Sequence, residues 1–346
     1  MNLADLNKVA LAMVTPGKGI LAADESSGTI KKRFDSIKVE STADTRRDYR
    51  EMLFRTRDAM ENYISGVILY DETIRQNAKD GTPLVKLIEQ AGSIPGIKVD
   101  AGAKAMAAFP GEQVTEGLDG LRERLAEYYK LGARFAKWRA VIDIGREGNR
   151  AMPSYSCLRA NMHALARYAA LCQEAGVVPI VEPEVLMDGD HDIDRCFEVT
   201  QLTLNLLYED LYFARVALEG TILKPNMVIA GRKSAKQSGV SEIAEKTVRC
   251  FRRAVPAAVP GIVFLSGGQS DVEATANLNA MNAEYRKVMP WALSFSYGRA
   301  LQAAPLKAWG GKAENIAAGQ RAFLHRAKMN GLAQLGEWSD GLEKAA

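Results

Sequence analysis

The sequence contains few of the residues that build metal sites and disulfide frameworks. Its 346 residues include three histidines and four cysteines, and the cysteines are Cys157, Cys172, Cys196 and Cys250. No two of them have C-x-x-C spacing, which excludes a zinc ribbon and a thioredoxin-like motif. The segment 188–192 has the composition of a metal loop without the EF-hand register, and it favours a solvated turn. We therefore expect no metal, no other cofactor, and free thiols in a reducing cytoplasm.

Long hydrophobic runs and a strong net charge are also absent. No stretch approaches the roughly 18 apolar residues of a membrane span, and the N-terminal segment lacks the basic region of a secretory signal. The net charge of +3 gives no field that would attract nucleic acid or a membrane surface. With 47% hydrophobic and 25% charged residues, the composition is that of an ordinary globular protein, so we expect neither nucleic acid nor membrane as a partner.

What the sequence does contain is a repeated alternation of strand and helix patterns. Eight short apolar runs each start roughly 30–45 residues after the last, the length of a βαβ unit. Amphipathic patterns lie between them, for example over 46–60, and a capping box at Ser270 opens another helix. The apolar runs cover residues 19–23, 66–70, 96–99, 134–138, 177–181, 221–223, 261–265 and 291–295.

Near-continuous apolar strands separated by helices predict an all-parallel sheet. Eight repeats predict an α/β fold closed as a (β/α)8 TIM barrel. A doubly wound open sheet is the alternative, but no glycine-rich loop has the G-x-G-x-x-G spacing that such a sheet would need for a dinucleotide. No interdomain linker stands out, so residues 1–346 are expected to form a single domain with an N-terminal helix and a short C-terminal tail.

Charged residues end several of these runs. The run 221–223 leads into Lys224 and Pro225, and because proline cannot donate to the ladder, the strand should stop at Lys224. The carboxyl ends of strands are where α/β barrels keep their chemistry. Charged groups at positions that the pattern would bury are costly unless they have a function. The other residues of this kind are Asp24, Lys98, Lys137, Arg139, Glu182 and Glu184.

The types of these residues suggest iminium chemistry. A lysine is a nucleophile only when deprotonated, and both burial and a second ammonium group lower the pKa of a lysine. Lys224 with Lys137 would form such a pair, since residues in one barrel layer come from alternate strands. A free amine attacks a ketone to form an iminium, an electron sink that lets a neighbouring C–C bond break. Asp24 or Glu182 would carry the protons.

Two glycine-containing turns are candidates for binding phosphate. Ser266-Gly267-Gly268 presents backbone N–H groups ahead of a helix, and Gly298-Arg299 does so after the eighth run, which ends near Ser296. The loops after strands seven and eight are the usual phosphate site of a barrel. An anionic, phosphorylated substrate is therefore expected.

At these residues the chain resembles a class I fructose-bisphosphate aldolase. The resemblance runs from about residue 17 to residue 329 and implies a barrel that cleaves fructose 1,6-bisphosphate into dihydroxyacetone phosphate and glyceraldehyde 3-phosphate, in glycolysis and gluconeogenesis. It also implies a homotetramer. The segments that carry it are 17–26 (GKGILAADES), 96–100 (GIKVD), 135–139 (FAKWR), 178–184 (VPIVEPE), 223–227 (LKPNM), 264–270 (FLSGGQS) and 296–302 (SYGRALQ).

The resemblance also implies a role for each residue. Lys224 matches the Schiff-base lysine of the family and Glu182 its general acid/base. Asp24 and Lys137 match residues of proton handling and charge control, and Glu184 a supporting carboxylate. The residues that match the site of the ketose 1-phosphate are Ser266, Gly267 and Arg299, with Gly268, Ser296 and Gly298 beside them, and those near the distal phosphate are Ser26, Lys98 and Arg139.

Two departures from the family pattern and several alternatives stand beside this interpretation. Thr29 replaces a family serine, and the family's C-terminal tail ending in tyrosine is missing, since the last tyrosine is Tyr297. Another iminium lyase, of the transaldolase or deoxyribose-phosphate aldolase kind, is an alternative, as are pyridoxal phosphate on Lys224 and a non-catalytic scaffold. The two phosphate sites and Trp138-Arg139 favour the bisphosphate.

Overall fold

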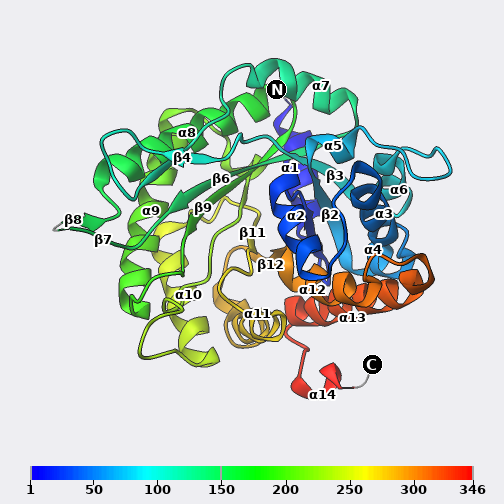
Figure 1. Cartoon of the computed structure of the whole chain (residues 1–346). Coiled ribbons are helices and arrows are strands. Elements are labelled where there is room, and N and C mark those ends of the chain that lie inside the picture. The colour runs from blue at the N-terminus through cyan, green and yellow to red at the C-terminus, as the bar shows by residue number, and fades with distance from the viewer. Residues whose placement is uncertain (1, 149, 345–346) are drawn as a thin grey trace.

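Eight parallel strands form a closed barrel in the computed structural model, which describes residues 2–148 and 150–344 (Figure 1). Neighbouring strands follow one another along the chain, and β1 closes the barrel by pairing with the last strand, with Ile20 opposite Ser296. The predicted (β/α)8 fold is confirmed. The barrel strands are β1 (Gly19–Ala23), β2 (Ile64–Leu69), β3 (Ile94–Lys98), β6 (Phe135–Ile142), β9 (Val178–Val185), β10 (Ile222–Leu223), β11 (Gly261–Phe264) and β12 (Ala292–Tyr297).

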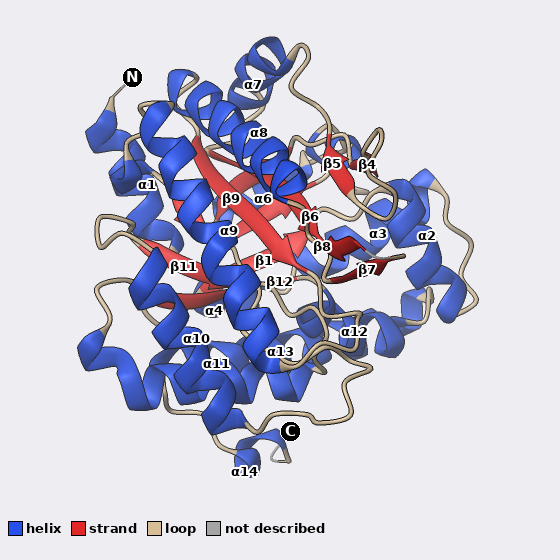
Figure 2. Cartoon of the chain, turned by 90° about the vertical axis from the view of Figure 1, so that its left-hand side faces the viewer, coloured by secondary structure: helices blue, strands red, loops and turns tan. Residues whose placement is uncertain are grey.

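Helices surround the barrel, as Figure 2 shows with strands in red inside a layer of blue helices. Several begin at a side-chain cap, and Ser270 forms the predicted capping box with Glu273. The helices are α1 (Leu3–Met13), α2 (Ser27–Ser36), α3 (Ala43–Phe54), α4 (Arg57–Tyr63), α5 (Asp71–Ile74), α6 (Leu84–Gln90), α7 (Leu121–Lys130), α8 (Tyr155–Glu174), α9 (Ile193–Phe213), α10 (Val240–Ala254), α11 (Asp271–Tyr285), α12 (Arg299–Trp309), α13 (Ile316–Leu335) and α14 (Asp340–Glu343).

Besides shifts of one to two residues at other strand ends, the structure differs from the sequence-based expectation in three main respects. The pattern 46–60 is not one helix, because the helical conformation is interrupted at Arg55 and Thr56, between α3 and α4. The strands β6 and β9 are longer than predicted, because they pair over eight consecutive residues each. Two short hairpins were not predicted: β4 (Ala103–Ala105) with β5 (Gln113–Thr115), and β7 (Gly145–Glu147) with β8 (Arg150–Met152). Of the expected domain, Met1, Asn149, Ala345 and Ala346 lie outside the described residues.

The interior of the barrel explains where the charged residues go. Successive side chains of a strand point to opposite sides, so every second residue faces inward. On four of the strands, a charged residue lies two positions after an inward-facing apolar residue. These charged residues are Asp24, Lys137, Glu182 and Lys224. The inner apolar cluster contains Ile20, Ala22, Ile68, Phe135, Val178, Ile180, Ile222 and Val263, together with Leu6, Ala10, Met13 and Val14 from α1 and the residue after it. The helix α1 therefore closes one end of the barrel, and the charged layer lies at the other.

Phe135 fills much of this interior, and glycine on the neighbouring strand makes room for it. A Cβ atom built on Gly96 would lie 2.2 Å from Cε2 of Phe135, far inside van der Waals contact. The pairing of Gly96 with Phe135 in the β3–β6 register is what brings the two together. A side chain at residue 96 would therefore displace the aromatic ring from this position.

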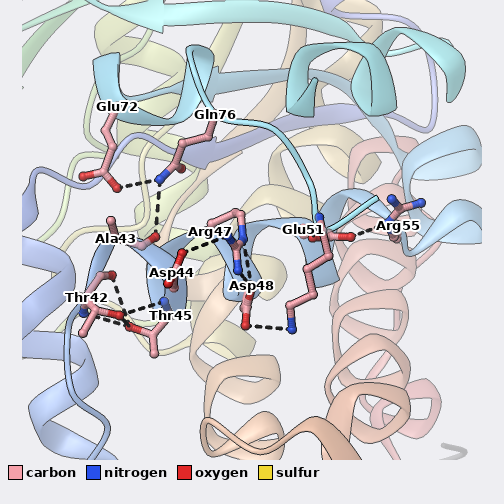
Figure 3. A network of polar contacts seen from close by, with 11 residues as sticks. Thr42, Ala43, Asp44, Thr45, Arg47, Asp48, Glu51, Arg55, Glu72 and Gln76 are labelled. Atoms are coloured by element: carbon pink, nitrogen blue, oxygen red, sulfur yellow. Dashed lines mark hydrogen bonds and ion pairs between the residues drawn. The ribbon is translucent and has the colours of Figure 1, made fainter. Parts of the chain in front are cut away.

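A network of polar contacts surrounds the helix α3 (Figure 3). Thr42 and Thr45 form its capping box, and Gln76 donates from Nε2 to the Ala43 carbonyl at 3.3 Å. Along one face of α3, Asp44, Asp48 and Glu51 pair with the basic side chains of Arg47, Arg55 and Lys79. The buried face of α3 packs against the neighbouring helices α6 and α13, and it carries Arg50.

Candidate active site

Four charged side chains from four strands form a continuous chain of alternating sign. The Nζ atom of Lys137 lies 2.8 Å from Oδ2 of Asp24 and 3.1 Å from Oε2 of Glu182. The other carboxylate oxygen of Glu182, Oε1, lies 3.3 Å from Nζ of Lys224. All four side chains are almost completely buried, with at most 12% exposed. The Nζ atoms of the two lysines therefore contact one shared carboxylate, that of Glu182.

These contacts change the pKa values of the chain's members. Burial alone would raise the pKa of the Asp24 carboxyl, but the charges of Lys137 and Lys224 outweigh burial and hold that pKa well below its usual range. Burial likewise opposes ionisation of Glu182, and the same two lysines lower its pKa. For Lys137, burial favours the neutral amine, but Asp24 and Glu182 raise its pKa above the ordinary value. Both carboxylates and Lys137 are therefore charged at neutral pH.

A second ionic pair flanks this chain on the same strands. Arg139 donates from Nε to Oε2 of Glu184, and burial is outweighed by the charge of Glu184, which raises the pKa of the guanidinium. The backbone N–H of Arg139 lies 3.3 Å from Oδ2 of Asp100, and Nζ of Lys98 lies 3.5 Å from Oδ1 of the same residue. Asp100 thus connects Lys98 at the end of β3 with Arg139 in β6.

A cavity of about 520 Å³ opens onto these groups and collects nearly all the predicted site residues. The turns 266–270 and 297–299 lead into α11 and α12, so the cavity faces the amino ends of two helices. Burial, Arg232 and Arg33 all lower the pKa of Arg299, which shows several cations converging there. The predicted residues that line the cavity are Asp24, Ser26, Lys98, Lys137, Arg139, Glu182, Glu184, Lys224, Ser266, Gly267, Ser296, Gly298 and Arg299.

Gly268 is the one predicted site residue that does not line this cavity. Its φ angle of 79° lies in the left-handed region, and a Cβ atom there would come within 2.1 Å of Cγ of Met187. The requirement for glycine at this position therefore comes from the turn and from the close approach of Met187.

Comparison with known families agrees with this geometry. The family model described as fructose-bisphosphate aldolase class-I matches residues 5–346. The chain belongs to the class I fructose-bisphosphate aldolase family. The predicted family is confirmed over nearly the whole chain.

Relatives from bacteria, plants and a protozoan are similar over nearly the whole chain. "Probable fructose-bisphosphate aldolase class 1" of Xanthomonas campestris is 58% identical over 98% of this chain and 99% of that protein. The cytosolic fructose-bisphosphate aldolase 6 of Arabidopsis thaliana is 56% identical over 94% and 88%. The solved structure of the aldolase of Plasmodium falciparum, in complex with TRAP and a small-molecule inhibitor, has a TM-score of 0.94 at 48% identity and covers 98% of this chain and 96% of that one.

The reaction of this family is the reversible aldol cleavage of fructose 1,6-bisphosphate through a lysine Schiff base, a step of glycolysis. A class I aldolase uses the iminium as its electron sink in place of a metal ion. The chain is accordingly an aldehyde-lyase. In the ranges 2–148 and 150–344, no cluster of three or more His, Cys, Asp or Glu side chains could hold a metal ion. Within the same ranges, no helix combines the length and the apolar character needed to cross a membrane.

Several residues of the cavity were not predicted from the sequence. Thr29 and Arg33 come from α2, and Glu25 follows Asp24 at the end of β1. Asp100 follows the end of β3. A search for charged residues just past each apolar run would have found both Glu25 and Asp100. Arg33 carries no such signal, because it lies on a helix whose position relative to the barrel only the folded structure reveals.

The C-terminal segment as far as residue 344 packs on the outer helices. The indole N–H of Trp338 donates to Oε1 of Glu343 at 3.0 Å, and the backbone N–H of Trp338 donates to Asn279 of α11. Arg326 of α13 pairs with the other carboxylate oxygen of Glu343 at 2.5 Å. Tyr297, the last tyrosine of the sequence, is buried and donates its hydroxyl hydrogen to the carbonyl of Ala274. The contacts of Trp338 and Glu343 hold the described part of the tail against α11 and α13.

Proposed function

We propose that Lys224 is the Schiff-base lysine and that Glu182, Lys137 and Asp24 handle the charge and the protons of the aldol cleavage. The observation that carries the proposal is the buried chain Asp24–Lys137–Glu182–Lys224, in which each contact is 3.3 Å or shorter. Borohydride trapping with dihydroxyacetone phosphate, followed by peptide mass mapping, tests it. A reduced adduct on Lys224 is the expected result.

The proposed steps follow from this arrangement. The neutral amine of Lys224 attacks the ketone carbon, and the hydroxyl of the resulting carbinolamine leaves as water after receiving a proton. Glu182, ionised before the reaction and in contact with Lys224, is placed to take the proton that frees this amine and then to deliver it to the departing hydroxyl. Asp24 then accepts the proton of the sugar hydroxyl whose carbon is released as an aldehyde, and the electrons of the broken C–C bond pass to the iminium. Lys137 stabilises both carboxylates while protons move.

The phosphate groups of the sugar are proposed to lie at opposite ends of the cavity. Ser266, Gly267, Ser296, Gly298 and Arg299 would hold the ketose 1-phosphate, which the amino ends of α11 and α12 and the cationic surroundings of Arg299 support. For the distal phosphate we propose Ser26, Lys98 and Arg139. Glu184 holds the guanidinium of Arg139 and is proposed to orient it.

Removal of metal should leave this activity unchanged. Because the iminium accepts the electrons of the broken bond, no Lewis acid is required. We expect the rate of fructose 1,6-bisphosphate cleavage to be the same before and after dialysis against EDTA, measured with a coupling system that does not itself need a divalent metal. Loss of the activity in EDTA, restored by zinc or another divalent ion, would contradict the mechanism.

We also propose that the chain is a single-domain subunit of a cytoplasmic homotetramer. Two plant relatives are named as cytosolic or cytoplasmic enzymes, and all four cysteines are buried and free, which suits a reducing compartment. At the end of α9, Tyr212 and Phe213 are 77% and 71% exposed and pack against each other. Exposed aromatic side chains of this size are typical of protein interfaces.

A charge in this aromatic pair should dissociate the oligomer. Phe213→Asp would bury a carboxylate in the proposed interface, so we expect a smaller particle than the wild type by size-exclusion chromatography with light scattering. Val272→Asp is the matched control, since Val272 is an exposed apolar side chain of α11. The same mass for the Phe213 variant and the wild type would show that this face of α9 is not an interface.

A further inference from the structure

Two buried ionisable side chains have no part in the steps described above. Glu25 directly follows Asp24, and its side chain is 4% exposed, while that of Arg50 on α3 is 1% exposed. Burial lowers the pKa of Arg50, as expected for a cation removed from water. Placing both charges in the interior is costly unless they compensate each other or serve a purpose.

Two buried residues, Gln302 and Arg50, hold Glu25 in place. Its Oε1 atom accepts a hydrogen bond from Nε2 of Gln302 at 2.8 Å, and the same nitrogen donates to the Ala22 carbonyl at 2.6 Å. Nη2 of Arg50 donates to the Glu25 carbonyl at 3.0 Å and lies 3.8 Å from its Oε2. The carboxylate of Glu25 is thereby fixed to the end of β1, next to Asp24.

The same carboxylate oxygen of Glu25 that contacts Gln302 also contacts Arg33, which lines the cavity. Nη1 of Arg33 donates to Oε1 of Glu25, and the side chain of Arg33 is 26% exposed. A Cβ atom built on Gly298 would lie 3.6 Å from Nη2 of Arg33, so this guanidinium reaches the turn that begins α12. Arg33, a residue of α2, thus lines a site that is otherwise formed largely by the ends of the strands.

The charges of this group do not cancel. One carboxylate lies between two guanidinium groups, and only Arg33 of the two arginines lines the cavity. Arg50 offsets the charge of Glu25 from behind, which leaves the positive charge of Arg33 available to an anion in the cavity. We propose that Glu25, backed by Arg50 and Gln302, is a positioning residue that aims Arg33 at a phosphate group of the sugar substrate. This inference rests on the proposed function of the cavity.

A purely structural role makes a different prediction. If Glu25 only ties α2, α3 and α12 together, its loss lowers stability and leaves substrate binding unchanged in the folded enzyme. If it positions Arg33, its loss raises KM through Arg33 and changes kcat little, because Arg33 contacts none of the four residues of the catalytic chain. The two roles therefore separate in a comparison of KM with kcat.

The experiment is a double-mutant cycle of Glu25→Gln and Arg33→Gln. Glu25→Gln retains the shape of the side chain and removes its charge. We expect it to raise the KM for fructose 1,6-bisphosphate about 10-fold, the size of one weakened hydrogen bond to a charged group. Added to Arg33→Gln, it should raise KM no further. Additive effects on KM, or an unchanged KM in Glu25→Gln, would overturn the inference.

Two further variants keep the result interpretable. Glu72→Gln is the matched control, because Glu72 pairs with Arg46 of α3 at 2.8 Å and lines no part of the cavity, so its KM should equal that of the wild type. If Glu25→Gln does not fold, Gln302→Met removes the hydrogen bond to Glu25 and should give a smaller rise in KM that also disappears with Arg33→Gln. An unchanged KM in that variant would likewise overturn the inference.

The choice of substrate identifies the phosphate. A rise in KM for both fructose 1,6-bisphosphate and fructose 1-phosphate would assign Arg33 to the 1-phosphate, and a rise for the bisphosphate alone would assign it to the distal group. Either result supports the positioning role. Borohydride trapping of the wild type is measured in parallel, so that a failure of the Schiff-base chemistry is recognised separately from a failure of this inference.

Discussion

Lys224→Arg should abolish both the cleavage of fructose 1,6-bisphosphate and borohydride trapping by dihydroxyacetone phosphate. Arginine retains the positive charge beside Glu182 but cannot form an iminium at neutral pH, since its guanidinium stays protonated. We expect kcat to fall by about 10⁵-fold or more, the scale on which an enzyme loses its nucleophile. The measurements are steady-state cleavage and the mass of the reduced adduct.

The matched control is Lys312→Arg, which changes an exposed lysine far along the chain from the catalytic residues. That variant should cleave and be trapped like the wild type. Thermal unfolding of Lys224→Arg should remain cooperative, because the buried ion pair with Glu182 keeps its charge. An adduct that persists in Lys224→Arg, or that maps to Lys98 or Lys137 in the wild type, would refute the assignment of Lys224.

Lys137→Met should lower kcat by about 10³-fold and move the acid limb of its pH profile to higher pH. Charged and hydrogen-bonded groups in an active site commonly contribute on this scale. The sign of the shift follows from the pKa values: Lys137 is among the groups that hold the pKa of Asp24 and of Glu182 down. Without it both pKa values rise, so both carboxylates take up a proton at a higher pH than in the wild type.

Lys137→Arg separates charge from geometry in the same experiment. Because the positive charge stays between Asp24 and Glu182, the acid limb should remain near its wild-type position even though the larger side chain lowers kcat. Met at this position also leaves two buried carboxylates with less counter-charge, so its free energy of unfolding should fall by about 3–5 kcal/mol, measured by urea denaturation at pH 7. An unchanged acid limb in Lys137→Met would show that this lysine does not set the ionisation of the carboxylates.

Much of this site was accessible from the sequence because a barrel converts a linear pattern into a spatial one. Period-2 alternation places Asp24, Lys137, Glu182 and Lys224 one inward step beyond an apolar residue, and closure of the barrel brings these steps to one layer. The strand limits were less accessible. The apolar run 177–181 suggested a strand that ends at residue 181, yet β9 continues to Val185, because its pairing with β6 continues through Pro183.

The contributions of the outer helices could not be predicted in this way. Arg33 and Arg50 occupy helical positions whose spacing is that of ordinary amphipathic faces, and nothing local distinguishes a cation that turns toward the cavity. Their positions depend on how α2 and α3 pack against the ends of the strands. The break between α3 and α4 could not be predicted either, since no glycine or proline marks it. At the break, the Thr56 hydroxyl donates to the Met52 carbonyl at 2.9 Å.

The pairing of β1 with β12 has a consequence for the synthesis of the protein on the ribosome. About 270 residues separate the end of β1 from the start of β12, and at roughly 5–20 residues per second the nascent chain carries an unpaired β1 edge for about 15–55 seconds. The charged layer that contains Asp24 and Lys137 stays open until β12 has emerged, because β1 closes the barrel by pairing with β12. During that interval the open sheet exposes two apolar edges that favour pairing with other chains, so chaperones have most to protect just before the last strand is released.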